Sequence, residues 1–428
     1  MTFAGLMDML PPNASRAAID AHQVKLLAPL AADLWERNRF WQAKWNAVGP
    51  FEIRSVADLE RLPLTTKSEL LADQERHPPY GTNLTEPLAA YTRLHQTSGT
   101  KGKPLRWLDT PANWRWLLGC WRQIFAKAGV EASARVFFPF SFGPFLGFWT
   151  AFDAAASIGC LTIPGGGLST GARLHLLLEN EATALCCTPT YALHMAVAAR
   201  EANIDLPGRS KVRTIIVAGE PGGSIPATRA RIEEAWNARV IDHTGLTEVG
   251  PLATECRDSP GSLEALEGDF IVEVRDPATL APTASGSIGE LIVTNLGRAA
   301  SPLLRYRTGD LVRPVWPSEG FMRFEGGVLG RVDDMIPLRG NNFYPSSIEA
   351  VLRRFPEVVE YQVEVDTTSP LAELRIDVEP LPDGDAGLAQ RIAQAIRDEL
   401  LFRADVTLVK QGSLPRFEMK ALRVRRKS

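Results

Sequence analysis

The chain has 428 residues, of which 45% are hydrophobic and 23% are charged, so it can bury a large core and is expected to form more than one domain. Its formal net charge of −3 provides no long-range attraction to nucleic acid or to an acidic membrane surface. The sequence contains no run of about eighteen apolar residues that could span a bilayer. We therefore expect a cytoplasmic protein without a membrane or nucleic-acid partner.

Two compositional features exclude further classes of protein. The 5 cysteines form no C-x-x-C pair and are odd in number, which argues against a disulfide framework and against a zinc site. We expect buried thiols and no zinc. The basic residues 423–427 are too short a run to indicate nucleic-acid binding, and we expect them to be a solvated end.

Helices are predicted for the first part of the chain. Residues 16–39 carry apolar side chains at helical spacing. Thr66, followed three residues later by Glu69, is typical of a capping box that begins a helix. Residues 110–128 predict an amphipathic helix whose tryptophans face the core.

From residue 134 onward, short apolar runs alternate with helical patterns, which indicates parallel strands joined by crossover helices. The predicted strands are residues 135–140, 161–164, 184–188, 212–218 and 239–242. The segments that follow them should lie as loops at the edge of the sheet where ligands bind. These are residues 141–144, 165–167, 188–191, 219–221 and 243–245.

The pattern changes twice more. Short strands separated by turns (270–274, 289–294 and 311–314) predict an antiparallel subdomain. The last hundred residues predict a small α+β unit with helices at 346–354 and 386–401 and strands at 358–365, 372–378 and 405–410. We therefore predict an α/β protein with a large N-terminal α/β domain, residues 1–330, and a small α+β domain, residues 331–428.

Residues 96–104 have the composition of a loop that holds a polyphosphate. Gly99 and Gly102 allow backbone N–H groups to turn toward an anion, hydroxyl groups add donors, and Lys101 and Lys103 add positive charge. The spacing is not that of the P-loop, which excludes that class of nucleotide-binding protein. A plain solvated turn is the alternative for so short a segment.

Further segments follow the loop in a distinctive order. They are Ala218-Gly219-Glu220-Pro221, Thr244-Gly245-Leu246-Thr247-Glu248, Arg305-Tyr306-Arg307-Thr308-Gly309-Asp310, Gly330-Arg331-Val332-Asp333-Asp334, Arg339-Gly340-Asn341-Asn342-Phe343-Tyr344-Pro345, and a final motif that ends at Lys420. Together with the loop, they resemble the adenylate-forming superfamily of acyl-CoA synthetases, and within it the phenylacetate-CoA ligase branch.

The resemblance implies a fold, cofactors and a site. ATP, Mg²⁺ and CoA would be used, the small domain would swing about a hinge at Asp333, and Gly340 would line the CoA channel. Lys420 and Glu248 would be catalytic, with Glu248 also binding the magnesium. ATP would be held by Thr97, Ser98, Gly99, Thr100, Gly102, Lys103, Gly219, Glu220, Pro221, Thr244, Asp310 and Arg331.

Each role has a plainer alternative. Glu248 could be an acid at a helix N-terminus, Asp310 a turn residue and Lys420 an exposed lysine. The sequence also departs from the family at Thr244, where many relatives carry an aromatic residue that stacks on adenine. Adenine must then pack against another group.

The residues expected to line the acyl pocket are mostly aromatic or apolar, which suits a flat ring. They are Phe142, Pro144, Phe145, Trp149, Tyr191, His243 and Gly245. His243 and Tyr191 could each hydrogen-bond a ring substituent. We expect a small aromatic acid of the benzoate, anthranilate or phenylacetate type, although these aromatic residues could simply be core.

Two functions remain open. The first is an ATP-dependent aryl-CoA ligase. The alternative is a protein that adenylates a carboxylate and passes it to a carrier-protein thiol or an amine, or that only binds the acyl group or nucleotide. Nothing in the sequence separates CoA from a carrier-protein thiol, and a homodimer is left open.

We predict that Lys420→Ala loses adenylate formation while ATP binding survives, because the lysine would act where charge develops in the transition state. Pyrophosphate release and equilibrium binding of ATP measure the two effects separately. Near-normal pyrophosphate release would remove Lys420 from the mechanism.

Overall fold

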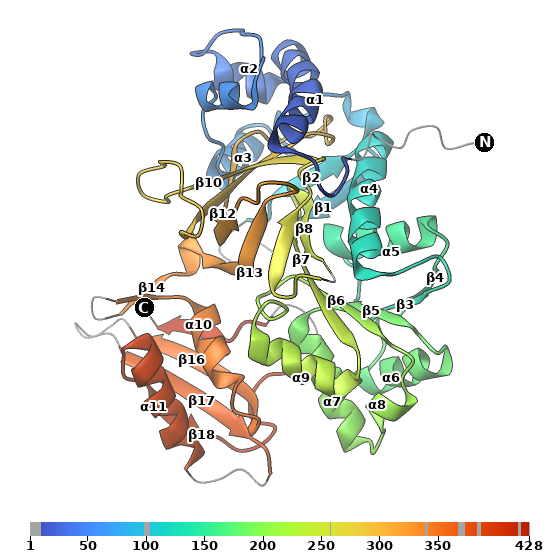
Figure 1. Ribbon diagram of the computed structural model, residues 1–428, viewed down its shortest axis with the longest axis vertical. Coiled ribbons are helices and arrows are strands. Elements are labelled where there is room, and N and C mark those ends of the chain that lie inside the picture. Colours follow the sequence, from blue (N-terminus) through green and yellow to red (C-terminus); the bar gives the residue numbers. More distant parts are fainter. Residues whose placement is uncertain are drawn as a thin grey trace.

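A computed structural model of the protein describes residues 10–97, 103–256, 258–338, 341–366, 373–382, 387–417 and 421–427. This part of the chain contains an 11-stranded sheet, a 4-stranded sheet and two 2-stranded sheets. In Figure 1 the N-terminal helices lie at one end of the large sheet, and the small domain, orange to red, lies beside α9 (Pro226–Trp236). No helix in the described ranges is long and apolar enough to cross a bilayer.

The N-terminal helices follow their capping residues. They are α1 (Arg16–Arg37), α2 (Arg39–Trp45) and α3 (Lys67–Arg76), with short 3-10 turns η1 (Val56–Arg61) and η2 (Leu88–Ala90). The predicted helix 16–39 is confirmed as α1, which ends at Arg37 because the side chain of Asn38 accepts from the backbone N of Trp41 and caps a second helix, α2. The capping box of Thr66 and Glu69 is confirmed at the start of α3.

The predicted parallel strands are confirmed as β3 (Arg135–Phe138), β4 (Leu161–Pro164), β5 (Ala184–Cys187), β6 (Thr214–Val217) and β7 (Arg239–Leu246). Helices α4 (Pro111–Ala128) and α5 (Leu146–Ser157) cover one face. The other face carries α6 (Thr170–Glu179), α7 (Pro189–Glu201), α8 (Leu206–Arg209) and α9. Because strand side chains alternate, Phe137 packs with α6 and α7, and Phe138 packs with α4 and α5.

The antiparallel strands continue the same sheet. They are β8 (Gly250–Glu255), β9 (Ser262–Ala265), β10 (Phe270–Arg275), β11 (Gly289–Asn295), β12 (Tyr306–Val315) and β13 (Arg323–Arg331), and β7 joins the two halves by pairing with β6 on one side and β8 on the other. The prediction of a loop at residues 243–245 is therefore wrong, since β8 extends the ladder and keeps these residues within β7.

The small domain has its own core. Its elements are β14 (Ile336–Leu338), β15 (Asn341–Phe343), α10 (Pro345–Leu352), β16 (Val358–Asp366), β17 (Glu373–Pro380), α11 (Leu388–Leu400), β18 (Asp405–Leu408) and β19 (Val424–Lys427), with Ile348, Val363 and Ile392 fully buried between them. The prediction that residues 423–427 form a solvated end is correct for the exposed side chains of Arg425 and Lys427 but wrong for Arg423 and for the backbone. β19 pairs in parallel with β16, and Arg423 is buried.

One buried ion pair connects distant parts of the large domain. Arg298, which follows β11, donates from Nε and Nη2 to the two carboxylate oxygens of Asp109 at 2.7 and 2.6 Å, and both side chains are inaccessible to solvent. Asp109 ends β2 (Arg106–Asp109). Burial raises the pKa of Asp109, but Arg298 and His95 lower it by more. The net pKa is below its ordinary value, so the carboxylate stays ionised.

We predict that Arg298→Met lowers the free energy of unfolding by about 3–5 kcal/mol, because it leaves the charge of Asp109 buried without its partner. Arg54→Met is the control, since its ion pair with Glu52 is 78% and 71% exposed, and solvent screening should make its contribution to stability small. Urea unfolding measures the free energy of unfolding of both variants. An equal loss in Arg298→Met and Arg54→Met would contradict the expectation.

Candidate active site

The predicted phosphate loop is the tip of a β-hairpin. Strands β1 (Arg93–Gln96) and β2 pair in antiparallel fashion. At the base of the tip the N–H of Thr97 donates to the carbonyl of Leu105 at 3.0 Å, and the N–H of Leu105 donates to Oγ1 of Thr97 at 3.0 Å. The base is therefore fixed by the two residues that bracket the loop.

Only some of the residues predicted to bind phosphate in this loop are described by the structure. Ser98, Gly99, Thr100 and Gly102 lie outside the described residues, as do Lys420 and Gly340. The side chain of Lys103 is exposed and pairs with Glu75 at 3.0 Å. Because both partners are solvated, this pair is weak and leaves Lys103 available to an anion.

Glu248 lies in the turn between β7 and β8, where it is buried. The hydroxyl group of Tyr306 donates to its Oε1 at 2.7 Å, and Nζ of Lys67 lies 4.0 Å from the same atom. Burial and the neighbouring Glu248 raise the pKa of Tyr306 well above its ordinary value, so the phenol keeps its proton and remains a donor. Glu248 is thus held in one orientation.

A single carboxylate suits the magnesium that the resemblance implies. Mg²⁺ keeps several waters and binds through one or two carboxylates together with substrate phosphates. The described residues contain no group of three or more acidic, His or Cys side chains that could enclose a metal by themselves. Glu248 would hold the ion, which would neutralise charge on the phosphates.

Asp310 and Arg331 are brought together by strand pairing. They lie opposite each other on β12 and β13, and Nη1 of Arg331 donates to Oδ1 of Asp310 at 2.5 Å. Gly309 makes room for this arginine, because a Cβ at that position would lie 2.9 Å from its Nη2. Two predicted nucleotide-binding residues therefore share one site.

In the motif 219–221, the side chain of Glu220 is held by backbone donors. Its carboxylate accepts from the N–H of Thr190 at 2.9 Å and from the N–H of Ala421 at 2.6 Å. Burial raises the pKa of Glu220, while Arg423 and these donors oppose the shift. Contact with adenine is left to the backbone of Gly219 and to Pro221, and their role stays a prediction.

Several predicted pocket residues gather at the start of α5. The rings of Phe142 and Trp149 lie 4.7 Å apart, and Nε1 of Trp149 donates to the carbonyl of Gly143 at 2.8 Å. The carbonyl of Pro144 accepts from the N–H of Gln96 at 2.8 Å, which places this segment against the base of the phosphate hairpin. Phe145 packs edge-on against Phe148.

His243 lies on β7 near the same core cluster, with its ring 4.6 Å from that of Trp121. Burial lowers its pKa to about 4, so the ring is neutral at neutral pH. Among the described residues, Nδ1 of His243 is buried without a hydrogen-bond partner. Thr244 and Gly245 follow in the ladder with β8, where a Cβ at Gly245 would meet the carbonyl of Gly250 at 2.6 Å.

Tyr191 is not brought to this group. It belongs to the core cluster that includes α6 and α7, whereas Phe142 and Trp121 belong to the cluster of α4 and α5. Its hydroxyl group accepts from Nη1 of Arg173 at 2.7 Å. The predicted hinge residue Asp333 lies in η3 (Val332–Asp334), directly after β13, and is exposed.

Sequence reasoning assigned no role to Tyr306. The signal was present, because strand residues alternate between faces and Tyr306 lies four residues before Asp310 on β12. Both side chains are buried, and the period of two would have placed Tyr306 on the same face as the acid.

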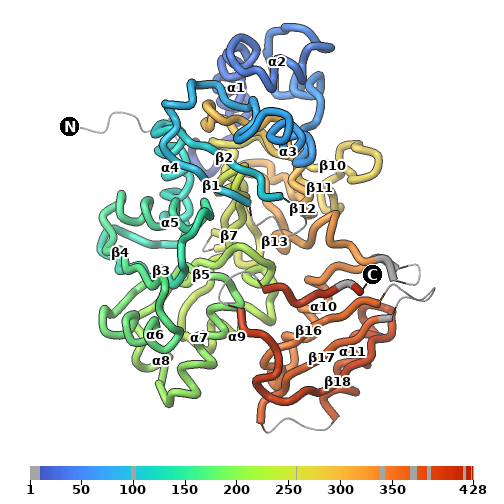
Figure 2. Tube along the Cα trace, turned by 180° about the vertical axis from the view of Figure 1, so that it is seen from behind, coloured from blue at the N-terminus to red at the C-terminus, as the bar shows by residue number. Residues whose placement is uncertain are grey.

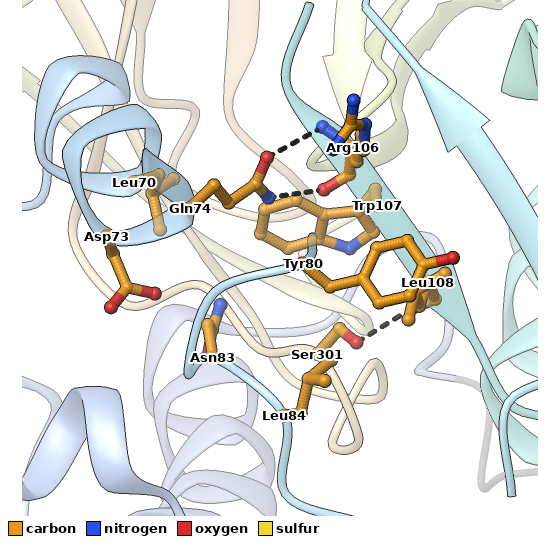
Figure 3. A pocket seen from close by; sticks show the side chains of 10 residues that line it. All are labelled: Leu70, Asp73, Gln74, Tyr80, Asn83, Leu84, Arg106, Trp107, Leu108 and Ser301. Atoms are coloured by element: carbon orange, nitrogen blue, oxygen red, sulfur yellow. Dashed lines mark hydrogen bonds between the residues drawn. The ribbon is translucent and has the colours of Figure 1, made fainter. Parts of the chain in front are cut away.

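Figure 3 shows a separate small cavity between α3, β2 and the segment around Tyr80. Gln74 closes one side through hydrogen bonds with the backbone of Arg106. The volume of about 10 Å³ accommodates no more than about one water, so this cavity is too small for a nucleotide or an acid.

Comparison with known proteins defines the class. The family model for AMP-binding enzyme matches residues 13–299, and that for AMP-binding enzyme C-terminal domain matches residues 340–427. The chain belongs to the AMP-binding enzyme family. It is 31% identical to phenylacetate-coenzyme A ligase of Thermus thermophilus, over 95% of this chain and 96% of that protein. It is 30% identical to the Escherichia coli enzyme of that name, over 96% and 95% respectively. The chain is accordingly an AMP-forming acid–thiol ligase.

Solved structures of 2-hydroxyisobutyryl-CoA ligase distinguish two arrangements. The match to the structure of the postadenylation state with 2-HIB-AMP has 27% sequence identity and a TM-score of 0.91. It covers 98% of this chain and 94% of that chain. The thioesterification state with CoA is 28% identical, covers 100% and 96%, and has a TM-score of 0.73. Sequence identity and coverage are nearly equal for the two states, so the difference in TM-score reflects the placement of the two domains. That placement in this protein resembles the postadenylation state.

We predict that Glu248→Gln raises the magnesium concentration for half-maximal pyrophosphate release by about tenfold or more, because it removes a charged ligand. Thermal melting should change little, since the amide oxygen still accepts from Tyr306. Glu273→Gln is the control, a largely buried carboxylate that pairs with Arg305 instead. An unchanged magnesium dependence in Glu248→Gln would exclude Glu248 as the metal ligand.

Proposed function

We propose that the protein activates a small aromatic carboxylic acid as its acyl-adenylate and then transfers the acyl group to CoA. The observation that carries this proposal is the group of aromatic side chains, including Phe142 and Trp149, that lies against the base of the phosphate hairpin. An aromatic wall provides apolar area and ring contacts for a flat substrate. The names of the curated relatives support the same class of acid.

The residues divide the work of the first step. A carboxylate oxygen attacks the α-phosphate and pyrophosphate leaves, so two anions must approach while charge develops. The hairpin loop would supply donors and positive charge, Glu248 would hold the magnesium, and Asp310 would accept from the ribose. Lys420 would contact the carboxylate and the α-phosphate, because a lysine is a compact charge on a flexible stem.

His243 would supply a polar contact among the mostly apolar residues that we propose to line the acyl site. Its neutral ring and buried Nδ1 without a partner favour a substrate group that can complete a hydrogen bond, such as an amino or hydroxyl substituent. An unsubstituted ring leaves that atom unsatisfied. We therefore propose that a polar ring substituent improves binding.

One alternative to CoA as the acyl acceptor is kept, a carrier-protein thiol, which the class of acid–thiol ligase also allows. The sequence also left open an amine acceptor and binding without ligation, and the similarity to phenylacetate-coenzyme A ligases argues against both. A small aliphatic hydroxy acid is the second substrate candidate, because 2-hydroxyisobutyryl-CoA ligase is structurally similar. The oligomeric state, the domain boundary at 330–331 and a cytoplasmic location stay predictions.

The test compares benzoate, 2-aminobenzoate and phenylacetate with 2-hydroxyisobutyrate, octanoate and palmitate, each with ATP and magnesium, with and without CoA. We expect kcat/KM for the best aromatic acid to exceed that for any aliphatic acid by about tenfold or more, as burial of a ring contributes about 1.5–3 kcal/mol. Pyrophosphate and thioester are measured separately.

Each outcome separates the alternatives. Preference for an aliphatic acid would overturn the aromatic proposal. Pyrophosphate release without thioester would favour a carrier-protein or amine acceptor. Absence of both pyrophosphate and thioester would favour a binding protein. Trp149→Ala should lower turnover of the aromatic acids more than that of 2-hydroxyisobutyrate, which links the preference to the pocket.

A further inference from the structure

The segment between Lys420 and β19 lies against the large domain. Figure 2 shows the red end of the chain passing beside α7 and α9 before it enters the small sheet. The contacts are made by Ala421 and Arg423, which immediately precede β19. Because Lys420 is the residue before Ala421, whatever holds this segment also limits where the lysine can lie.

Glu220 joins the two domains through its carboxylate. One oxygen accepts from the N–H of Thr190, in the first turn of α7, and the other accepts from the N–H of Ala421, in the small domain. A carboxylate at a helix N-terminus is favoured by the helix dipole, and it already has the geometry to accept a second N–H. The carboxylate of Glu220 is thus held in a fixed position in which it accepts a hydrogen bond from Ala421.

Arg423 makes the second connection. Within the small domain its guanidinium is oriented by Glu360, to which Nε donates at 2.6 Å and Nη2 donates at 3.2 Å. Nη2 also donates to Oγ1 of Thr190 at 3.1 Å, across the domain boundary. Only 6% of Arg423 is exposed, so both contacts are shielded from water and are stronger than a surface pair.

A third contact lies farther along the interface. Nη2 of Arg231 on α9 donates to the carbonyl of Val358, at the start of β16, at 3.0 Å. All three contacts join groups on different domains, and all exist in the arrangement that resembles the postadenylation state. A swing of the small domain that carries residues 421–423 away from α7 must break them.

We propose that Glu220, Thr190 and Arg423 form a latch that holds the adenylate-forming arrangement, and that they act as positioning residues for Lys420. Contacts made in one arrangement alone shift the equilibrium between arrangements by their differential free energy. The latch therefore favours adenylation and opposes thioester formation. This inference rests on the two-step ligase reaction but not on the identity of the acid.

The test measures the two half-reactions separately. Thr190→Val removes the hydroxyl acceptor of Arg423 at nearly constant shape, and Glu220→Gln replaces one of two acceptor oxygens with a donor. For each variant we expect pyrophosphate release to fall by about tenfold or more, since contacts to charged groups are lost. In Thr190→Val, which changes no predicted nucleotide-binding residue, thioester formation from supplied acyl-adenylate and CoA should be unchanged or faster.

Thr228→Val is the matched control. Thr228 is a buried threonine on α9 in the same domain, and its hydroxyl group has no partner in the described part of the chain. Both half-reactions should keep their wild-type rates. The conservative Arg423→Lys keeps the charge opposite Glu360 but loses the fork that reaches Thr190, so it should show the same split as Thr190→Val.

A measurement without activity completes the test. Amide hydrogen exchange of residues 421–427 in the ligand-free protein should be faster in Glu220→Gln than in wild type, because Ala421 loses its acceptor. Equal loss of both half-reactions, no loss, or selective loss of thioester formation would each overturn the latch. If wild type turns over only aliphatic acids, the aromatic proposal fails while the split, measured with the accepted acid, still decides the latch.

Discussion

A buried guanidinium connects the β1–β2 hairpin, which we predict to hold phosphate, to the turn that carries Glu248. Arg298 binds Asp109, which ends the second strand of the hairpin, and its Nη1 donates to the carbonyl of Thr247, the residue before Glu248, at 2.8 Å. Only a planar cation with several donors can bind a carboxylate in bidentate fashion and still reach a carbonyl. The spacing between loop and turn thus depends on an interaction in the interior.

The remaining site is arranged by strand pairing around that frame. β7 belongs to both halves of the large sheet, so the acid at its end faces residues delivered by β12. Tyr306 and Asp310 come from the same face of β12, and Arg331 comes from its neighbour β13. Four polar groups from three segments therefore converge without a long loop, which reduces the entropy lost when ligands bind.

Motifs and periodicity predicted most of the fold and part of the site. Short apolar runs located β3 to β7 because a buried parallel strand needs apolar residues on both faces. The same local rules failed at residues 243–245, where pairing with β8 decides the conformation, and at Arg423, whose burial depends on Glu360 and Thr190 far away in the sequence. Tyr191 was assigned to the pocket because it follows a strand end, but it lies in the first turn of α7 and its ring packs in the core cluster of α6 and α7.

The pairing of β19 with β16 sets a tether length. Val424 lies opposite Val363, so the backbone of residue 424 is fixed in the small domain. Lys420 is four residues earlier, and a fully extended chain of that length spans at most about 14 Å. With the catalytic role that we propose for it, Lys420 would be too closely tethered to leave the active site by local unwinding of a long loop. Clearing the site for a second reactant would then require movement of the folded small domain, and the speed of that rigid-body motion would set an upper limit on turnover.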